Sequence, residues 1–429
     1  MSPPETLAVL PFGNPGGDPQ FEYLTSGIAE EIAGTLACVH ALRVTASRTA
    51  EAAASRHSVG RDAAAELGVA TVLEGSARKV GAKLQLQAQL VHVADGAVRW
   101  SQRYDRPFAE LPAVQVEVVQ EVVSALGAAA TDMERRLLET PATTDVRAYD
   151  SYLQARRFSH QLLRRNQESA RELFSQAIDF DGKFGAAYAG LATAHAMLFQ
   201  YWDSSEENLQ AAEAASAEAV SLDGRRPDPH VTRGLALSLV KRYDEAQAEF
   251  ETAVAICPTS FDACYFLARS CRARGQYAEA AVWFERACDL RPDDYATPAL
   301  LASCYVSLGR PDDARARQHR SLELAQQHLD RNPDDARTLY LGAGALATIG
   351  DTAKAREWAK RAIAMDPDDS AVLYNVACAY AILRLSDSAI DCLEQAIANG
   401  FKHWEWIEHD SDLDSLRQHP RFTALLAQR

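Results

Sequence analysis

The sequence YDEAQAEFETA at residues 243–253 decides the fold, because it recurs as YAEAAVWFERA at residues 277–287. The two copies start 34 residues apart, and the same spacing separates Gly234 from Ala268 and Pro258 from Pro292. Small residues let two helices approach closely, the phenylalanine fills the space beside them, and the proline ends the second helix. Each copy is therefore predicted to be one pair of antiparallel helices.

The same period continues on both sides of these copies. Leu339 and Leu373 are 34 apart, and a pair of alanines, Ala355 and Ala389, keeps the phase. One unit has a second helix that is predicted to be longer, which delays its closing proline, Pro333, by seven residues. The pattern resembles the tetratricopeptide repeat, and this resemblance implies a right-handed superhelix of helix pairs.

The repeats set the expected domain boundaries, and the chain is expected to be mainly α. We predict an α+β domain in residues 1–138, a linker in 139–145, about seven helix pairs in 146–400, and capping helices in 401–429. The α+β domain is expected to contain a mixed sheet of about five strands and three helices. Its expected strands are Leu7–Phe12, Leu42–Ala46, Thr71–Val80, Lys83–Val93 and Val98–Tyr104. Its expected helices begin at the N-cap Asp18 and Pro19, cover Arg61–Leu67, and run over 113–138.

Three segments of this first domain carry a second resemblance. They are LAVLPFGNPGGDPQFEYLTSGIAEEI at 7–32, LGVATVLEGSAR at 67–78 and GAVRWSQRYDR at 96–106. They are similar to the TolB-like domain, related to the flagellar FlgO type, that precedes tetratricopeptide repeats in many bacterial proteins. Such proteins often carry a nucleotide cyclase or kinase domain upstream, so the resemblance implies a regulatory or sensor region as one possible function.

Composition limits the classes of function and the compartment. The formal net charge of −15 argues against a general nucleic-acid binder, which needs a clustered basic surface. Most of the eight cysteines lie in apolar helical contexts, and Cys264 and Cys271 fall at core positions of a repeat, so we expect buried thiols in a reducing compartment. No stretch has the length and apolar character of a membrane span. A cytoplasmic protein is expected, and whether it is a piece of a longer one stays open.

The glycine-rich loop Gly13, Gly16 and Gly17 is the main candidate for phosphate binding. It lies between a predicted strand and a predicted helix, where backbone amides can receive an anion. However, the lysine of a phosphate-binding loop is absent, and a carboxylate follows the last glycine. We interpret the loop as a tight turn, and Glu30 and Glu31 in the next helix as solvated residues.

A second candidate is a metal site near the C-terminus. His403 and His409 lie close in sequence to Asp410 and Asp412, which are possible ligands. The surrounding segment is also typical of the helices that cap repeat arrays, and we favour that interpretation. No signature of a hydrolase, kinase or metalloprotease occurs. We therefore expect no enzyme activity, cofactor or metal, and an enzyme without a recognised motif stays open as a further alternative.

The remaining hypothesis is a partner-binding groove. In tetratricopeptide arrays the first helix of each pair lines the concave surface, and the resemblance assigns that surface to six residues here: Tyr265, Arg269, Arg272, Ser303, Tyr340 and Tyr374. Two arginines three residues apart share one helical face and can bind a carboxylate bidentately. We therefore predict an interaction scaffold for a protein or peptide with an acidic or C-terminal carboxylate. The alternatives are arginines that pair with Asp262 and, for the whole chain, a cyclase or kinase regulator; a homodimer also stays open.

Overall fold

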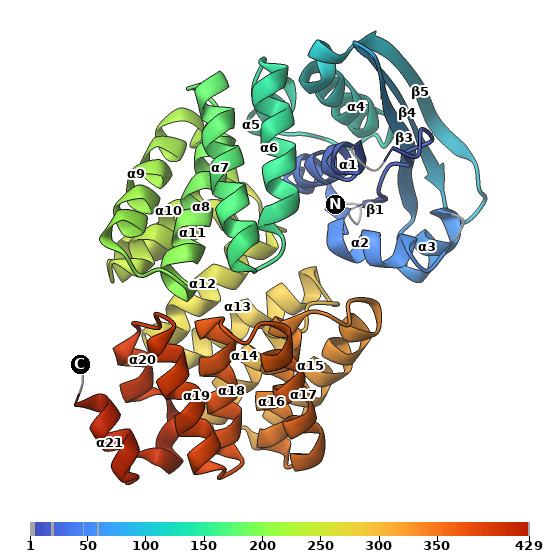
Figure 1. Cartoon of the computed structure of the whole chain (residues 1–429). Coiled ribbons are helices and arrows are strands. Elements are labelled where there is room, and N and C mark those ends of the chain that lie inside the picture. The colour runs from blue at the N-terminus through green and yellow to red at the C-terminus, as the bar shows by residue number, and fades with distance from the viewer. Residues whose placement is uncertain (1–4, 19–20, 46, 58–59, 428–429) are drawn as a thin grey trace. The chain divides into compact units, whose positions relative to one another are not determined.

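The computed structural model describes residues 5–18, 21–45, 47–57 and 60–427, and it is mainly helical with one sheet near the N-terminus, as predicted (Figure 1). The chain forms two compact units. The first contains residues 1–195, 211–270 and 289–292, and the second contains 196–210, 271–288 and 293–429. Among the described helices, none combines the length and the apolar character needed to cross a membrane.

The first unit begins with a five-stranded mixed sheet of order β2-β1-β3-β4-β5. Its strands are β1 (Glu5–Val9), β2 (Leu42–Val44), β3 (Thr71–Val80), β4 (Lys83–His92) and β5 (Val98–Pro107). Strand β1 pairs in parallel with β2 and β3, whereas β3-β4-β5 is an antiparallel meander. The short β2 and the ten-residue β5 are therefore the two edges of the sheet.

Helices cover the sheet unequally. On one face, α1 (Glu22–Ala37) and α4 (Leu111–Ala125) bury the alternating leucines of β4, among them Leu84, Leu86 and Leu90. On the other face, α2 (Ser47–Ala54) and α3 (Gly60–Glu66) pack on β1 and β3 through small residues such as Ala50 and Ala63. The polar alternate residues of β4 lie on this second face.

Three expectations for this domain were wrong in detail. Helix α2 was missed, although its alanine-rich sequence has high helix propensity. The helix expected over 113–138 is two helices, α4 and α5 (Asp132–Glu139), because Gly127 adopts a left-handed φ of 62° and Thr131 forms a capping box with Glu134. Helix α1 begins at Glu22 and not at the expected cap; Pro19 lies outside the described residues.

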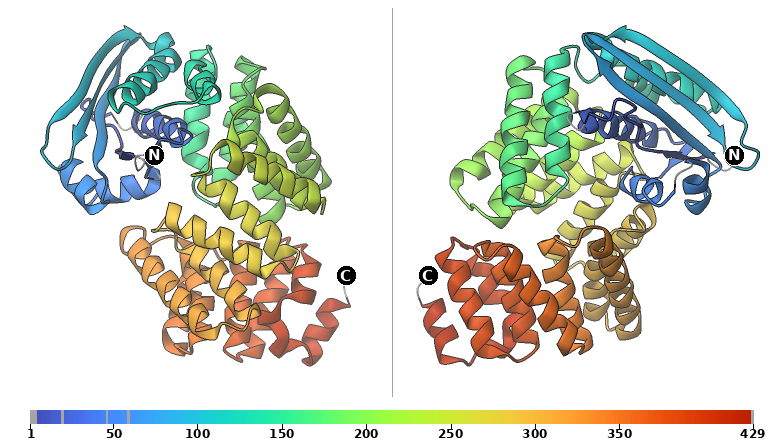
Figure 2. Two further views of the ribbon diagram at one scale, coloured as in Figure 1. Left: turned by 180° about the vertical axis from the view of Figure 1, so that it is seen from behind. Right: turned by 45° about the vertical axis from the view of Figure 1, so that its right-hand side comes forward.

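Fourteen helices follow in residues 146–398, all of them described, and they alternate as first and second members of seven consecutive pairs. They are α6 (Val146–Ser159), α7 (Arg164–Phe180), α8 (Gly185–Tyr201), α9 (Glu206–Asp223), α10 (Pro227–Leu239), α11 (Tyr243–Ile256), α12 (Phe261–Ala273), α13 (Tyr277–Leu290), α14 (Ala296–Ser307), α15 (Pro311–Arg331), α16 (Ala336–Ile349), α17 (Thr352–Met365), α18 (Ser370–Ile382) and α19 (Ser386–Ala398). The 21-residue α15 is the lengthened second helix that the delayed proline predicts. Helices α20 (Trp404–His409) and α21 (Pro420–Leu426) end the chain, with a short 3-10 helix between them, η3 (Ser411–Leu416). Figure 2 shows the successive pairs from two further sides.

One backbone position repeats with the same period as the sequence. Residues 241, 275 and 309 have φ values of 61°, 74° and 70°, and after the seven-residue extension the series continues at 350 and 384, with φ values of 88° and 61°. Each lies in the turn after the first helix of a pair, where a left-handed residue ends the helix. Glycine fills three of these positions, and Lys241 and Arg384 fill the other two.

Close helix approach within a pair depends on small residues. A Cβ added to Gly342 would overlap the ring of Trp358, and one added to Gly234 would lie 2.6 Å from the ring of Phe250. Ala280, which keeps the 34-residue spacing in the first turn of α13, is fully buried. The large ring of one helix therefore occupies the space that the small residue of the other leaves.

We predict opposite effects for two substitutions on α16. Gly342→Ala should lower the free energy of unfolding by about 1–3 kcal/mol, because its methyl group overpacks the Trp358 ring. Gly344→Ala is the control, since nothing lies within 4 Å of its added Cβ; it should be neutral or stabilise the helix by up to about 1 kcal/mol. Urea denaturation followed by circular dichroism measures both, and equal midpoints for the two variants would contradict this packing.

Candidate partner-binding site

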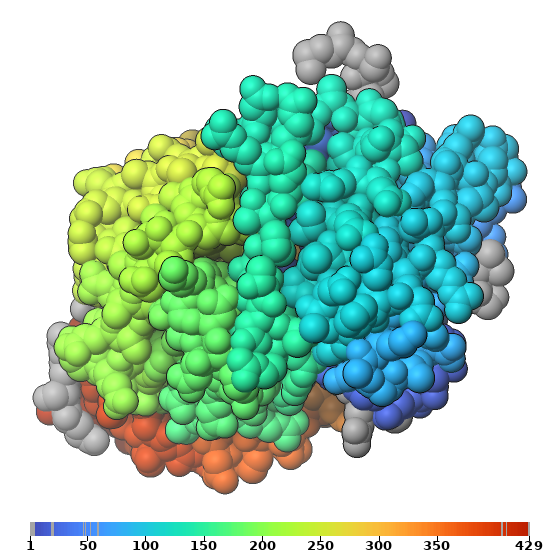
Figure 3. Space-filling view, turned by 90° about the horizontal axis from the view of Figure 1, so that it is seen from above, coloured from blue at the N-terminus to red at the C-terminus, as the bar shows by residue number. Residues whose placement is uncertain are grey.

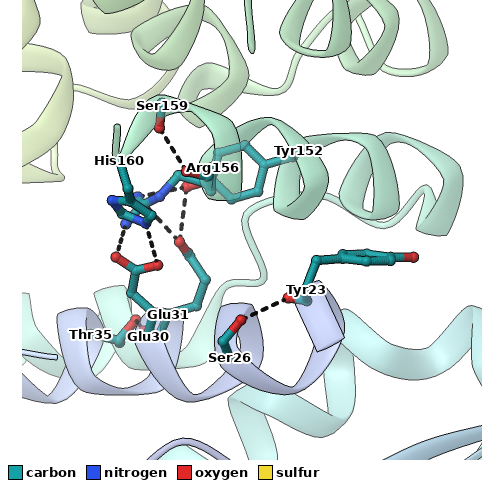
Figure 4. Close-up of polar contacts among 9 residues, drawn as sticks. All are labelled: Tyr23, Ser26, Glu30, Glu31, Thr35, Tyr152, Arg156, Ser159 and His160. Atoms are coloured by element: carbon teal, nitrogen blue, oxygen red, sulfur yellow. Dashed lines mark hydrogen bonds and ion pairs between the residues drawn. The ribbon is translucent and has the colours of Figure 1, made fainter. Parts of the chain in front are cut away.

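Helix α1 of the N-terminal domain packs directly against α6, the first helix of the first pair (Figure 4). Gly27 permits the approach, since an added Cβ would lie 3.1 Å from Cδ2 of Leu153. The hydroxyl of Tyr23 donates a 2.6 Å hydrogen bond to Asp150 Oδ1. In the space-filling view the N-terminal domain and the first repeat helices adjoin, and little of the dark blue α1 is visible between them (Figure 3).

An ion-pair network fixes this contact. Arg156 Nη2 lies 2.9 Å from Glu30 Oε1, and its Nη1 lies 3.3 Å from Glu31 Oε1. His160 Nε2 lies 2.9 Å from the second oxygen of Glu30, and the Tyr152 hydroxyl donates to Glu31 at 3.0 Å. The prediction that Glu30 and Glu31 are solvated was wrong: their side chains are only 21% and 16% exposed.

The pKa values of Glu30 and Glu31 are shifted in opposite directions. Burial alone would raise the pKa of Glu30, but the charges of Arg156 and His160 outweigh it and hold that pKa far below its usual range. Burial raises the pKa of Glu31, because Arg156 offsets it only partly and the negative charges of Glu30 and Asp228 add to it. The positive charge of Arg156 is therefore shared among several acids.

The far end of α1 contacts a later repeat. Thr259 Oγ1, in the loop before α12, donates a 2.7 Å hydrogen bond to the carbonyl oxygen of Ala37. Beside this bond the buried thiols of Cys38 and Cys257 interact, and that interaction together with burial raises the pKa of Cys38 well above its usual value. Helix α1 thus contacts α6 along its length and, at its C-terminal end, the loop before α12.

On α12 the structure shows how the predicted arginines are placed. The guanidinium of Arg269 lies 5.7 Å from the ring centres of both Tyr265 and Phe266, in cation–π geometry. Arg272 is exposed, and among the described residues no carboxylate, Asp262 included, lies within ion-pair distance of it. Tyr265 and Arg269, two of the six predicted residues, are in contact through their side chains.

The other three predicted residues differ in exposure. Ser303 is exposed and donates a hydrogen bond to the carbonyl of its own helix. Tyr340 and Tyr374 are buried, at 7% and 4% exposure, although the repeat pattern predicted that they face a groove. Tyr374 donates a 2.7 Å hydrogen bond to Asp410 and stacks on Phe401, so the C-terminal segment covers it. The six residues are divided between the two compact units.

At the candidate metal site the structure brings together a different set of residues from the predicted one. Ligand atoms of Cys378, Asp410 and Asp412 lie within 4.8 Å of one another, whereas His403 does not join them and the side chain of His409 lies outside those described. Asp410 already accepts hydrogen bonds at both oxygens from protein donors, one of them the amide of Asp412. Asp410 is the N-cap of η3, and this role explains its position without a metal ion.

In the glycine-rich loop, Gly13 has both of its backbone groups bonded to the sheet. The amide of Gly13 donates to Gly75 O at 2.8 Å, and Ala77 N donates to Gly13 O at 3.0 Å. Gly17 closes a turn by donating to Asn14 O and has a φ of 63°. These bonds agree with the interpretation of the loop as a tight turn.

Comparison with known families and sequences agrees with the repeats. Residues 231–295 and 294–368 match two tetratricopeptide-repeat models. The chain is 34% identical over 244 residues to "Putative adenylate cyclase 3" of Rhizobium meliloti (strain 1021), a match that covers 56% of this chain and 42% of that protein. It is 36% identical over 63 residues to a chloroplastic protein of Arabidopsis thaliana, covering 14% of this chain and 19% of that one. The chain thus spans less than half the length of either relative.

Solved structures resemble parts of the chain at low identity. TTC0263, a thermophilic TPR protein of Thermus thermophilus, is 18% identical, covers 45% of this chain and 98% of its own, and has a TM-score of 0.37. The Cut9–Hcn1 hetero-tetramer structure is 15% identical, covers 73% and 59%, and has a TM-score of 0.45. These scores carry no functional argument. The matched models and the helix pairs together show that the chain contains tetratricopeptide repeats.

We predict that Glu30→Gln lowers the free energy of unfolding by about 2 kcal/mol at pH 7, because charge-assisted bonds to Arg156 and His160 are lost. The contribution of Glu30 is present above its unfolded pKa of about 4.3 and is lost as the pH falls towards the lowered folded value. The variant should therefore lose stability at pH 7 and depend less on pH below about 4.

Glu31→Gln is the matched control for this experiment. The folded pKa of Glu31 is raised, so its ionisation opposes folding at neutral pH and protonation on acidification removes that cost. This variant should lose little or no stability at pH 7. Urea midpoints measured from pH 3 to pH 8 compare the two, and an equal loss in both variants at pH 7 would contradict the assignment of charges.

Proposed function

We propose that the protein is a non-enzymatic scaffold whose repeats bind a partner protein or peptide. The observation that carries this proposal is the docking of α1, in which side chains of α6 hold a helix of another domain by ion pairs and hydrogen bonds. The first helices of these repeats are thus chemically suited to bind a charged helical segment. Since α1 already covers α6, a partner needs another part of the array or must displace α1.

Helix α12, with the exposed Arg272 and the half-buried Arg269, offers such a part. Arg272 has no carboxylate partner among the described residues, and Arg269 rests on aromatic rings that hold its side chain in place. A guanidinium binds a carboxylate through two parallel hydrogen bonds, and aromatic rings pack on its flat face. We propose an acidic or C-terminal carboxylate as the anchor of the partner, with Tyr265 on the same helix as a further contact. A role for Tyr374 requires that the C-terminal segment uncovers it, and a role for the buried Tyr340 requires that it becomes exposed.

A regulatory region of a nucleotide-cyclase system is the second candidate. The observation that favours it is the 34% identity over 244 residues to a protein named a putative adenylate cyclase, of which this chain spans 42%. The proposed TolB-like character of the N-terminal domain is consistent with it. In this role the partner held by the repeats belongs to a signalling enzyme, and the scaffold itself performs no reaction.

We predict that an Arg269→Ala, Arg272→Ala variant loses partners that the parent recovers from native lysate by affinity capture. Charge-assisted bonds contribute about 1.5–3 kcal/mol each, so binding should weaken at least about tenfold. The control is Arg136→Ala, Arg165→Ala, which removes the same charge from exposed positions of α5 and α7. If the first variant keeps its helical circular dichroism and its affinity is unchanged, the proposed carboxylate anchor is wrong.

The captured fraction also tests the regulatory candidate. With ATP and Mg²⁺ added, it should form cyclic AMP if the partner is an adenylate cyclase, whereas the purified chain alone should form none. Mass spectrometry of the same fraction identifies the partner. A captured partner without any nucleotide-signalling activity would contradict the regulatory candidate and leave the scaffold intact.

A further inference from the structure

A cavity of about 380 Å³ lies in the N-terminal domain, between the sheet and the helices α2 and α3. Helix α2 packs on β1 and α3 packs on β3, on the face of the sheet opposite to α1 and α4 (Figure 1). The volume of the cavity falls in the range of small-molecule sites, about 300–1,000 Å³. Its described wall comes from the loop after β1, the end of α2, the start of α3, and the strands β3 and β4.

The cavity lies at a switch point of the sheet, just beyond the carboxyl end of β1. From β1 the chain continues to α1 on one face, whereas it reaches the parallel neighbour β3 from α2 and α3 on the other face. In open sheets, ligands bind in the crevice that such a change of face leaves at the carboxyl ends of the strands. Leu10 and Pro11, directly after β1, line this crevice together with residues 74–76, which follow the part of β3 that pairs with β1.

Polar side chains of β3 and β4 form the floor of the cavity. The register places Glu74 opposite Gln89 and Ser76 opposite Gln87. Side chains alternate along a strand, so these four share one face of the sheet, opposite to the buried leucines of β4. Gln87 is exposed and the other three are partly exposed. A ligand in the cavity can therefore reach all four side chains.

Much of the hydrogen-bonding capacity of this floor is not used by the protein. Gln89 Nε2 donates a 2.7 Å hydrogen bond to Glu74 Oε1, which orients the carboxylate. Within the described part of the chain, the side chains of Ser76 and Gln87 form no hydrogen bond with another residue. A glutamine amide offers two donors and an acceptor oxygen, and a serine hydroxyl both donates and accepts. The floor thus presents donors and acceptors side by side.

The rest of the wall is apolar and held in place. Leu10 is buried in the apolar cluster beneath α2 and α3, and its amide donates a 2.9 Å hydrogen bond to Leu73 O. At the start of α3, a Cβ added to Gly60 would overlap Glu74 Oε2, so the glycine leaves the space that the carboxylate occupies. A cavity whose walls are already fixed loses little conformational freedom when a ligand enters.

The charges at the cavity select the kind of ligand. Its described lining includes the carboxylate of Glu74 but neither lysine nor arginine, so an anion would meet a negative charge without compensation. The imidazole of His57 at the rim is already engaged, since its Nε2 lies 2.6 Å from Glu66 Oε2. An ammonium ion can pair with Glu74 but has no acceptor for the amide hydrogens of Gln87. A hydroxyl donates and accepts, so neighbouring hydroxyls satisfy both groups.

We propose that this cavity binds a neutral, hydroxyl-rich small molecule, namely a sugar or a polyol. Its hydroxyls bond to Glu74, Gln87 and Gln89, and its C–H groups lie against Leu10 and Pro11. Under the regulatory candidate above, such a ligand is a signal that the N-terminal domain receives. Binding itself does not depend on that candidate or on what the repeats hold, because the purified chain alone contains the whole cavity.

Thermal-shift measurements on the full chain test the class of ligand. The neutral probes are glucose, galactose, mannose, arabinose, maltose, trehalose, inositol and mannitol, and isothermal titration measures the dissociation constant of each probe that raises the melting temperature. At least one should bind more tightly than about 1 mM. Glucose 6-phosphate and glucosamine are the charged counterparts of glucose and should bind more weakly than the best neutral probe. The proposal is overturned if no neutral probe binds, or if a charged probe binds best.

Two variants locate the binding in this cavity. Gln87→Leu removes an exposed amide that bonds to no described residue, so the fold should persist, and the loss of two hydrogen bonds to the ligand should raise the dissociation constant at least about fivefold. Gln85→Leu is the matched control, because it changes the same side chain two residues away on the same face of β4, outside the cavity; it should bind like the parent.

Ser76→Phe fills the cavity with a ring and should abolish binding, and circular dichroism checks that each variant is folded. Equal affinity in the parent and in Gln87→Leu, or binding that survives in folded Ser76→Phe, would place the ligand elsewhere and refute the site.

Discussion

The close approach of two helices at a small residue is the constraint on which the repeats depend. Gly234 and Gly342 each leave the space that an aromatic ring of the next helix fills, and the same spacing of 16 residues separates each glycine from its ring. The left-handed turn residue between the helices recurs in phase with this contact, even across the seven-residue extension of α15. Two periodic local features therefore fix the length of a repeat. At Lys241 the turn conformation persists without glycine, which costs roughly 1 kcal/mol and shows that the packing of the pair sets the backbone.

These local features explain how much of the fold could be predicted. A period of 34 residues lies in the sequence itself, so the helix pairs and the lengthened α15 could be placed without any long-range information. Alternating leucines placed β4 for the same reason. The errors fell where a local signal was weak or was misread. Gly127 and the capping pair Thr131 and Glu134 are visible in the sequence, but the apolar stripe on both sides was taken as one helix.

The candidate site was less predictable because its contacts are distant in sequence. Glu30 and Arg156 are 126 residues apart, and nothing in the local pattern around either residue distinguishes a buried ion pair from two solvated charges. The burial of Tyr374 has the same origin. Its position in the repeat predicts a groove, but Asp410 and Phe401 of the capping segment occupy the space in front of it. Repeat patterns identify which face a residue lies on, but not whether another segment covers that face.

The chemistry of the contact between α1 and α6 determines how firmly α1 is held on the repeats. Arg156 is shared between Glu30 and Glu31, and the carboxyl of Asp228 is near enough to interact with the same guanidinium. Burial is the main cause of the raised pKa values of Glu31 and Asp228, and the charges of neighbouring acids add to it. Ion pairs of this kind orient two elements but return less free energy than their short distances suggest, since desolvation and like-charge repulsion oppose the attraction. The apolar contact of α1 with Leu153 and the other buried residues of α6 therefore supplies most of the docking energy, while the charges select its register.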